Sequence, residues 1–284
     1  VLSELAHPNI VRLYEVFRND AESYLVMEAC DGGHLLQSVL DAGRFSEAKA
    51  ASSMLQVIRA VRYLHERRVA HRDLKCENLL WQGRASDVLK LVDFGTSRRF
   101  VPGESMCSAV GTPLFISPEI IRGKYTEACD LWACGCMLYI LLAGYAPFHG
   151  KTNLETYKLI ATGPLRFRDE EWGAVSSVGK DLVRGLLNRK VALRLRAAQA
   201  LEHPWLQEAV ASERDPDIRR RAGELLARRL ADFAKQSIFK KLMLLVVAHL
   251  YREEDVGDLR RMFLCLDEGT GVLSRRVLEA ALPA

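Results

Sequence analysis

Near the start of the chain, two short and mostly apolar stretches, residues 11–17 and 24–27, stand out from their polar surroundings. Both stretches are rich in β-branched and aromatic residues, and a polar turn at residues 19–23 separates them. This pattern predicts an antiparallel β-hairpin. Apolar residues over 88–92 predict a further short strand, whereas residues 97–112 show no clear period and predict an irregular, mobile loop.

The middle of the chain has the three- and four-residue spacing that is typical of helices. Ser46 followed by Glu47 is a helix-start signal. The stripe that we expect to face the core consists of Met54, Leu55, Ile58, Val61, Leu64 and His65. Residues 129–142 are apolar on nearly all sides, which predicts a buried helix that ends at the glycine- and proline-containing residues 143–150. Helical patterns then resume through Trp205.

The last quarter of the chain has a basic helical stretch and, after it, a short acidic loop near Asp267. A polar stretch at residues 208–216 predicts a linker, and residues 214–241 carry nine basic and four acidic residues, a net charge of +5. Leucines and a phenylalanine give this segment one apolar face. Such a helix suits the groove of a calmodulin-like protein, but a solvated helix packed on its own domain explains the charge more simply.

Composition bounds the class of protein. The 284 residues, 49% apolar and 27% charged, predict a globular chain of one large domain or two. A net charge of +4 is too small to indicate nucleic-acid or membrane binding, and no apolar run is long enough to span a bilayer. Seven cysteines without a C-x-x-C pair indicate neither a disulfide framework nor a zinc site, so we expect a reducing, cytoplasmic location and no signal peptide.

The stretch HRDLKCENLL, residues 71–80, carries the candidate chemistry. Asp73 can accept a proton from an alcohol, Lys75 can neutralise a phosphoryl group, and Asn78 can offer an oxygen to Mg²⁺. Twenty residues after Asp73, the sequence DFG supplies Asp93 as a second oxygen donor. A metal, a phosphate and a hydroxyl could therefore meet at one point.

Two more motifs complete an ordered set, Ser-Pro-Glu at residues 117–119 and D-x-W-x-x-G at residues 130–135. Each motif alone is a weak signal, but the probability that all of them occur in this order by chance is negligible. The set resembles the protein kinase family from residue 1 to about Trp205. The resemblance implies an α+β, two-lobe fold with an incomplete N-lobe and a mainly helical C-lobe, followed by a helical C-terminal extension that contains a degenerate EF-hand.

The resemblance also implies four parts of the chain. We expect a partial kinase N-lobe at residues 1–30 and the C-lobe at residues 31–206. A basic regulatory or junction helix would follow at residues 207–241, and a degenerate first EF-hand region at residues 242–284. The implied activity is that of a serine/threonine kinase, a transferase that moves the γ-phosphoryl group of ATP to protein serine or threonine.

Site roles follow by the same resemblance. Asp73 looks like the catalytic base, and Lys75 looks like the phosphate contact that favours serine and threonine substrates. Asn78 and Asp93 look like the Mg²⁺ ligands. Thr112 would bridge toward Asp73 and Lys75 from the segment that follows DFG.

Further residues would hold the site together. Asp130, on the buried helix, would bind the backbone of His71 and Arg72, because a buried carboxylate needs such partners. Glu119 and Arg194 would form a structural ion pair. These assignments predict contacts between residues far apart in the sequence.

The nucleotide pocket and the segment after DFG give further assignments. The residues implied to contact the nucleotide base are Met27, Glu28, Cys30 and Leu80. Arg72 could pair with a phosphate or an acid within residues 97–112, where Ser105 and Ser108 are candidate phosphorylation sites. An exposed-loop role for both serines explains them equally well.

The chain departs from the family at its front end. It contains no G-x-G-x-x-G loop and no V-A-I-K lysine before the predicted hairpin. We expect an N-terminally truncated fragment, which alone would bind ATP poorly. The alternative is a pseudokinase scaffold that lacks both features and uses the tail to hold partners.

The tail narrows the resemblance to calcium-dependent protein kinases, which belong to the calcium/calmodulin-regulated branch. Residues 239–282 resemble their junction and first EF-hand, but a loop started at Asp267 has Val272 at position 6 and Leu278 at position 12. A loop started at Leu266 has Gly271 at position 6 but Val277 at position 12. Without the bidentate carboxylate at position 12, we expect no Ca²⁺ between Asp267 and Leu278. Ca²⁺ would act only through EF-hands beyond this chain. The implied partners are protein substrates and a calmodulin-like domain on the basic helix.

Overall fold

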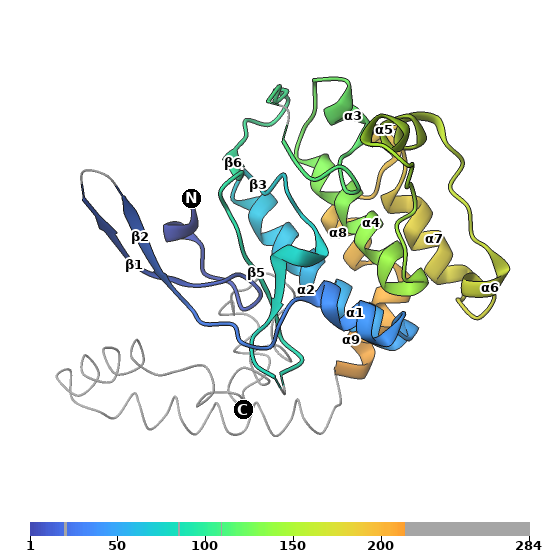
Figure 1. Cartoon of the computed structure of the whole chain (residues 1–284), viewed down its shortest axis with the longest axis horizontal. Coiled ribbons are helices and arrows are strands. Elements are labelled where there is room, and N and C mark those ends of the chain that lie inside the picture. The colour runs from blue at the N-terminus through green and yellow to red at the C-terminus, as the bar shows by residue number, and fades with distance from the viewer. Residues whose placement is uncertain (20–21, 85, 109, 214–284) are drawn as a thin grey trace, which may run out of the picture. The chain divides into compact units, whose positions relative to one another are not determined.

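The hairpin predicted near the N-terminus is confirmed. The computed structural model describes residues 1–19, 22–84, 86–108 and 110–213. After a short 3₁₀ helix, η1 (Leu2–Glu4), strands β1 (Leu13–Arg18) and β2 (Ser23–Met27) pair antiparallel, with an irregular register between Leu13 and Glu15. Figure 1 shows this hairpin extending away from the helices, and its apolar side chains are largely exposed.

Two helices follow the hairpin, α1 (Leu35–Ala42) and α2 (Glu47–Glu66). Ser46 caps α2 as its sequence predicts, because the Ser46 hydroxyl accepts a hydrogen bond from the Lys49 amide at 3.3 Å. The predicted stripe on α2 is buried from Met54 to Leu64, while His65 is only partly buried. The stripe therefore faces the core, and His65 stands at its edge.

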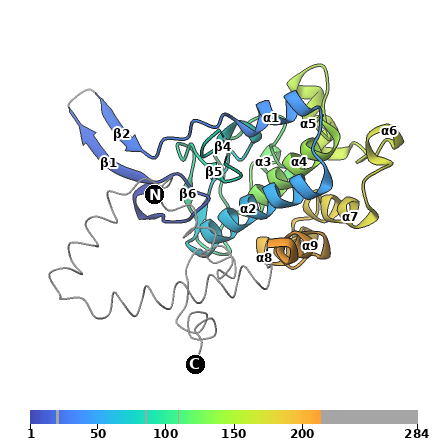
Figure 2. The ribbon, with the colours of Figure 1, turned by 90° about the horizontal axis from the view of Figure 1, so that it is seen from below.

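Helix α4 (Ala128–Ala143) is the buried helix that the sequence predicts. Every residue of it from Cys129 to Ala143 is buried. It packs against α2 and against α7 (Ser177–Leu186), and Figure 2 shows α2 and α4 side by side. Gly144 ends α4 in the left-handed conformation, with φ of +83°.

Short strand pairs lie between α2 and α3 (Pro118–Ile121) in sequence. Strand β3 (Val69–Ala70) pairs with β6 (Arg98–Arg99), and β4 (Leu79–Trp81) pairs with β5 (Leu89–Leu91), both antiparallel. The strand predicted at residues 88–92 is β5. Strand β6 falls within the segment predicted to be a loop, because two residues are too few to show a period.

The remaining described helices are mostly short. They are η2 (Cys76–Asn78), α5 (Asn153–Thr162), α6 (Asp169–Trp172), η3 (Val191–Leu193), α8 (Ala197–Leu201) and α9 (Pro204–Glu213). Helix α9 corrects the linker expected at residues 208–216, since that stretch is helical up to Glu213. Buried Trp205 and Leu206 anchor the start of α9, and the Trp205 indole N–H donates to Glu47 Oε2 at 2.6 Å.

The chain divides into two compact units, residues 1–209 and 210–284. The first unit has the expected α+β character, and within the described residues no helix is both long and apolar enough to cross a membrane. Residues 214–284 lie outside the described part, and so do most of the predicted basic helix and the whole degenerate EF-hand.

Gly144 offers a test of the packing at the end of α4. A Cβ at Gly144 would lie 2.3 Å from the Gly43 carbonyl oxygen, whereas a Cβ at Gly123 would meet nothing within 4 Å. Both glycines have φ of +83°. We expect Gly123→Ala to cost about 1–2 kcal/mol for the left-handed backbone alone, and Gly144→Ala to cost about 1–3 kcal/mol more through overpacking. Urea unfolding of both variants measures the difference, and equal losses would contradict the close approach.

Candidate active site

The backbone of the polar loop, residues 71–78, is held by a buried carboxylate. Asp130 lies in the first turn of α4 and is 1% exposed. Its Oδ2 accepts a hydrogen bond from the His71 amide, and its Oδ1 accepts one from the Arg72 amide, each at 2.9 Å. Arg72 has φ of +72°, a strained value for a residue other than glycine, and these bonds stabilise it. This is the contact that the resemblance implies for Asp130.

A second partner of Asp130 was missed from the sequence. His65, at the end of α2, lies with Nε2 2.9 Å from Asp130 Oδ2. Burial raises the pKa of Asp130, but the hydrogen bond and charge of His65, with the loop amides, outweigh burial and hold that pKa below its ordinary value. Asp130 is therefore a carboxylate. The apolar spacing around His65 concealed its polar role.

Asp73 receives two side-chain donors in the loop. Lys75 Nζ lies 2.7 Å from Asp73 Oδ2, and the Thr112 hydroxyl donates to Asp73 Oδ1 at 2.8 Å. Lys75 also donates to the Thr112 hydroxyl at 3.1 Å. The structure thus brings together the three residues expected to meet, although Thr112 lies 39 positions after Asp73.

These donors set the protonation state of Asp73. Partial burial raises the pKa of Asp73, but the hydrogen bonds from Lys75 and Thr112 and the charge of Lys75 outweigh burial, so the pKa lies below its ordinary value. Asp73 is a carboxylate at neutral pH. Each of its oxygens has further acceptor capacity, so the group can still orient a hydroxyl.

Asn78 and Asp93 come from adjacent backbone segments. The Asn78 carbonyl accepts a hydrogen bond from the Val92 amide at 2.9 Å, and the Asn78 side-chain amide donates to the Asp73 carbonyl at 2.8 Å. Asp93 has φ of +59° and its Oδ1 accepts from the Gly95 amide at 3.2 Å. The side chain of Asp93 is exposed and bonds to its own turn rather than to the polar loop.

This donor set fits Mg²⁺ better than a transition metal. Within the described residues, no three or more His, Cys, Asp or Glu side chains gather to hold an ion. Asn78 uses its amide nitrogen to bind the Asp73 backbone, which leaves its oxygen as a donor. Mg²⁺ typically takes one or two protein oxygens and fills its octahedron with waters and phosphate oxygens. Asp93 and Asn78 are of the residue types that offer such oxygens.

His71 is buried in the interior beside Asp93. Burial lowers the pKa of His71 and outweighs the opposing charge of Asp130. The Nε2 atom of the His71 ring lies 3.2 Å from the Val92 carbonyl oxygen, and the Nδ1 atom accepts a hydrogen bond from the Asp73 amide at 3.4 Å. One donor and one acceptor are what a neutral imidazole offers. The neutral ring therefore links the polar loop to the strand before Asp93.

The segment expected to contact a nucleotide base leads from β2 to β4. Met27 ends β2, and Cys30 follows it in the connection to α1. The Gly32 amide donates to the Trp81 carbonyl at 3.1 Å, and the Trp81 amide donates to the Gly33 carbonyl at 2.9 Å. These bonds place the end of the connection, at Gly32 and Gly33, beside Trp81, the residue after Leu80.

Glu28 forms an ion pair that sequence reasoning missed. Lys90 Nζ lies 2.6 Å from Glu28 Oε1, with the side chains 1% and 5% exposed. Lys90 lies opposite Leu80 in the β4–β5 register. The pair therefore attaches the Met27–Cys30 connection to the strand that leads to Asp93. The sequence analysis singled out no partner for Lys90, and the ion pair with Glu28 offsets the cost of burying its charge.

Arg72 reaches the segment of residues 97–112, which was expected to offer a phosphate or an acid. Its guanidinium donates to the Thr96 carbonyl at 2.7 Å and to the Ser108 hydroxyl at 2.8 Å. The partner within the segment is thus a neutral hydroxyl. Ser105, the other candidate for phosphorylation, is exposed.

The predicted Glu119–Arg194 pair is present and buried. Arg194 Nη1 and Nη2 lie 2.5 Å and 2.9 Å from the two Glu119 oxygens, and Nη1 also donates to the Ala128 carbonyl at 2.8 Å. Arg194 therefore connects Glu119, in α3, to Ala128 at the start of α4. Asp130 lies two residues later, so both anchors act on one end of α4.

Comparison with known proteins identifies one domain and a group of relatives. A family profile described as "Protein kinase domain" matches residues 1–206. Calcium-dependent protein kinase 5 of Plasmodium falciparum (isolate 3D7) is 37% identical over 276 residues, which cover 96% of this chain and 48% of that protein.

Plant proteins give similar values. Calcium-dependent protein kinase 3 of Oryza sativa subsp. japonica is 36% identical over 276 residues, 96% of this chain and 49% of the relative. Calcium-dependent protein kinase 8 of Arabidopsis thaliana is 36% identical over 278 residues, 97% of this chain and 51% of the relative. The chain spans about half the length of the curated relatives it matches.

The charge environment of Asp73 can be tested without an activity assay. We expect Lys75→Met to raise the pKa of Asp73, because it removes a hydrogen bond and a positive charge that lower this pKa while burial remains. The pH titration of the Asp73 carboxyl carbon by NMR measures the change. Lys49→Met, which removes a lysine that lies over the Phe45 ring, serves as the control. An unchanged Asp73 titration in Lys75→Met would contradict the assignment.

Proposed function

Because the chain belongs to the protein kinase family, we propose that it transfers the γ-phosphoryl group of ATP to a serine or threonine of a protein substrate. The observation that carries this proposal is the arrangement around Asp73. Lys75 and Thr112 orient its carboxylate, and Asn78 binds its backbone carbonyl. The activity requires little covalent chemistry from the protein, so a rigid, charged site suits it.

Asp73 would act on the substrate hydroxyl. Its carboxylate accepts the hydroxyl hydrogen and aligns the oxygen with the γ-phosphorus. The lowered pKa keeps the group ionised across the neutral range. Thr112 joins Asp73 to the segment on which a protein substrate would lie, so substrate binding and base orientation depend on one hydrogen bond.

Lys75, Asn78 and Asp93 would handle the phosphates. The Lys75 ammonium lies against Asp73, where it can compensate the charge of a phosphoryl group in transfer. Asn78 and Asp93 are the oxygen donors that would hold Mg²⁺. When bound, Mg²⁺ would supply positive charge that offsets the negative charge of the phosphates.

The nucleotide base would bind between the Met27–Cys30 connection and β4. Backbone groups of Glu28 and Cys30 would bond the adenine edge, with Met27 and Leu80 supplying apolar contact. The buried Glu28–Lys90 pair supports this assignment, because it fixes the connection to β5. A fixed connection reduces the entropy lost when the base binds.

Regulation by calcium is the finer part of the proposal. It rests on the similarity to calcium-dependent protein kinases and on the net charge of +5 over residues 214–241. The basic helix of residues 207–241 would block the substrate groove until a calmodulin-like domain binds it. Ca²⁺ would act through EF-hands other than residues 267–278. The cysteine pattern supports a cytoplasmic location.

A non-catalytic scaffold, the alternative that the sequence raised, has no support from the comparisons. The contacts of Asp73 with Lys75 and Thr112 also favour a transferase over a scaffold. A scaffold would need no carboxylate held between a lysine and a threonine. We therefore do not propose it as a second function.

Phosphate transfer should depend on Asp73. We expect Asp73→Asn to lower transfer from radiolabelled Mg-ATP to a serine/threonine peptide array by about 10²-fold or more, because the amide cannot accept the hydroxyl proton. Asp41→Asn, which changes an exposed aspartate on α1, should retain the rate. Circular dichroism checks that both variants fold. Equal rates for Asp73→Asn and wild type would refute the assignment of Asp73 as the catalytic base. No transfer by wild type would refute the proposed activity.

The inhibitory helix predicts a separate effect. Replacing Arg219, Arg220 and Arg221 by glutamine should raise the calcium-free rate of the full chain about fivefold or more, a typical size for coupling between sites. The same change should weaken binding of a calcium-loaded calmodulin-like domain, measured by calorimetry. Arg252→Gln, outside the basic helix, is the control. An unchanged calcium-free rate would end the idea of inhibition.

A further inference from the structure

We infer that Tyr125 is a positioning residue for the proposed phosphoryl transfer: through Met106, Ser108 and Arg72 it holds the segment of residues 97–112 so that Thr112 reaches Asp73. The inference rests on the proposed function for its effect on rate. Its structural part stands on contacts that are independent of any activity.

The backbone of Tyr125 pairs with the segment first. The Met106 amide donates to the Tyr125 carbonyl at 2.8 Å, and the Tyr125 amide donates to the Met106 carbonyl at 3.1 Å. The two residues form an isolated antiparallel bridge, outside any longer strand. This pair of bonds fixes the segment six positions before Thr112.

The side chain of Tyr125 adds a second fixed point. Its hydroxyl donates to the Ser108 carbonyl at 2.7 Å and accepts a hydrogen bond from Arg72 Nη1 at 3.1 Å. The Ser108 hydroxyl, which Arg72 Nη1 also contacts at 2.8 Å, lies 3.4 Å from the same oxygen. One hydroxyl thus connects the polar loop, through Arg72, to the segment that carries Thr112.

Arg72 cannot follow the segment freely, because its own position is set elsewhere. Its amide is bound by Asp130 at 2.9 Å, and its Nε donates to the Thr96 carbonyl at 2.7 Å. Arg72 therefore serves as the fixed end of the connection. The segment is the part whose position depends on Tyr125.

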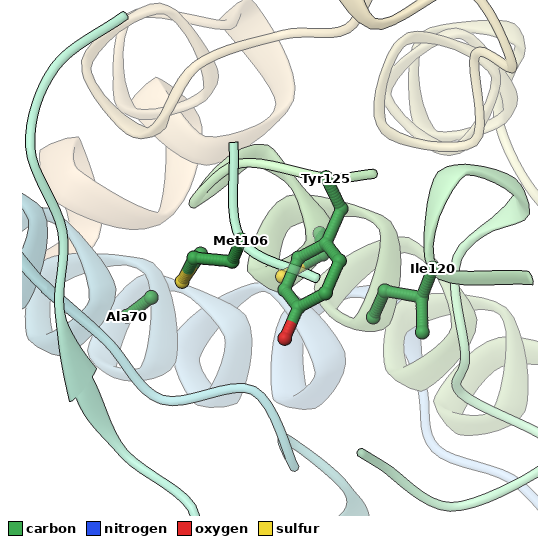
Figure 3. Close-up of a cluster of buried hydrophobic side chains, with 5 residues drawn as sticks. Ala70, Met106, Ile120 and Tyr125 are labelled. Carbon is green, nitrogen blue, oxygen red and sulfur yellow. The ribbon is translucent and has the colours of Figure 1, made fainter. Parts of the chain in front are cut away.

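Packing holds the Tyr125 ring in place. The ring is 2% exposed and belongs to a cluster of buried residues with Ala70, Met106, Ile120 and Cys129. Figure 3 shows the hydroxyl projecting from this cluster, with Met106 on one side of the ring and Ile120 on the other. A ring fixed in this way aims its hydroxyl in one direction, so loss of the hydroxyl should free the segment without a large cavity.

Removal of the hydroxyl alone provides the test, in the full 284-residue chain. Tyr125→Phe keeps the ring, and Tyr139→Phe is a matched control: Tyr139 is also 2% exposed, and its hydroxyl donates to the Arg166 carbonyl at 2.7 Å. We expect both variants to melt within a few degrees of each other. Tyr125→Phe should lower kcat for peptide phosphorylation about tenfold, the change that one lost positioning hydrogen bond produces, with KM for ATP unchanged; Tyr139→Phe should stay within about twofold of wild type.

Hydrogen exchange tests whether Tyr125 positions residues 97–112, even if no activity is found. Amides of residues 106–112 should exchange at least about fivefold faster in Tyr125→Phe than in wild type or Tyr139→Phe. Equal exchange in the three proteins would overturn the inference, and so would a Tyr125→Phe kcat equal to that of an active wild type. If wild type transfers no phosphate but exchange rises as expected, the proposed function fails and the positioning by Tyr125 stands.

Discussion

The carboxylate of Asp130 is the constraint on which the rest of the site depends. It lies inside a helix that is buried on every side, where an isolated charge would be costly. Two backbone amides and His65 supply the donors that offset this cost. In return they give the polar loop a strained backbone at Arg72 that a free loop would not keep. Asp73 follows Arg72 directly, so the direction of Asp73 is set by a residue 57 positions away in the sequence.

The segment of residues 97–112 reaches the same loop from the other side. It is bound at Ser108 by Arg72, at Met106 by the backbone of Tyr125, and at Thr112 by Asp73. The buried Glu119–Arg194 pair then fastens the chain that follows it. In the proposed transfer, a base and a substrate platform fixed to one framework would need no rearrangement, and a site built on positioning lowers a barrier in this way.

The sequence predicted those parts of the structure that repeat or carry a motif. The hairpin, α2, β5 and α4 have apolar patterns or apolar runs that identify them. The resemblance carried by the motifs indicated the partners of Asp130, Glu119 and Thr112. Partners without a motif were missed. His65 has the spacing of a core residue. Lys90 lies between two leucines in a short strand, which is the spacing of a solvent-facing position. Tyr125 lies in a short irregular stretch. The polar composition of residues 208–213 wrongly predicted a linker there. These residues are helical because they continue α9, whose start is anchored by buried Trp205 and Leu206.

The central claim is that Asp73, Asn78 and Asp93 converge on one Mg²⁺-bound nucleotide. A crystal structure of the full chain with Mg²⁺ and a non-hydrolysable ATP analogue tests it directly. The account predicts Mg²⁺ with oxygens of Asn78 and Asp93 about 2.0–2.1 Å away, and Asp73 facing the terminal phosphorus from the opposite side. Mg²⁺ and phosphates bound away from Asn78 and Asp93, in a chain whose polar loop is otherwise as described, would contradict it.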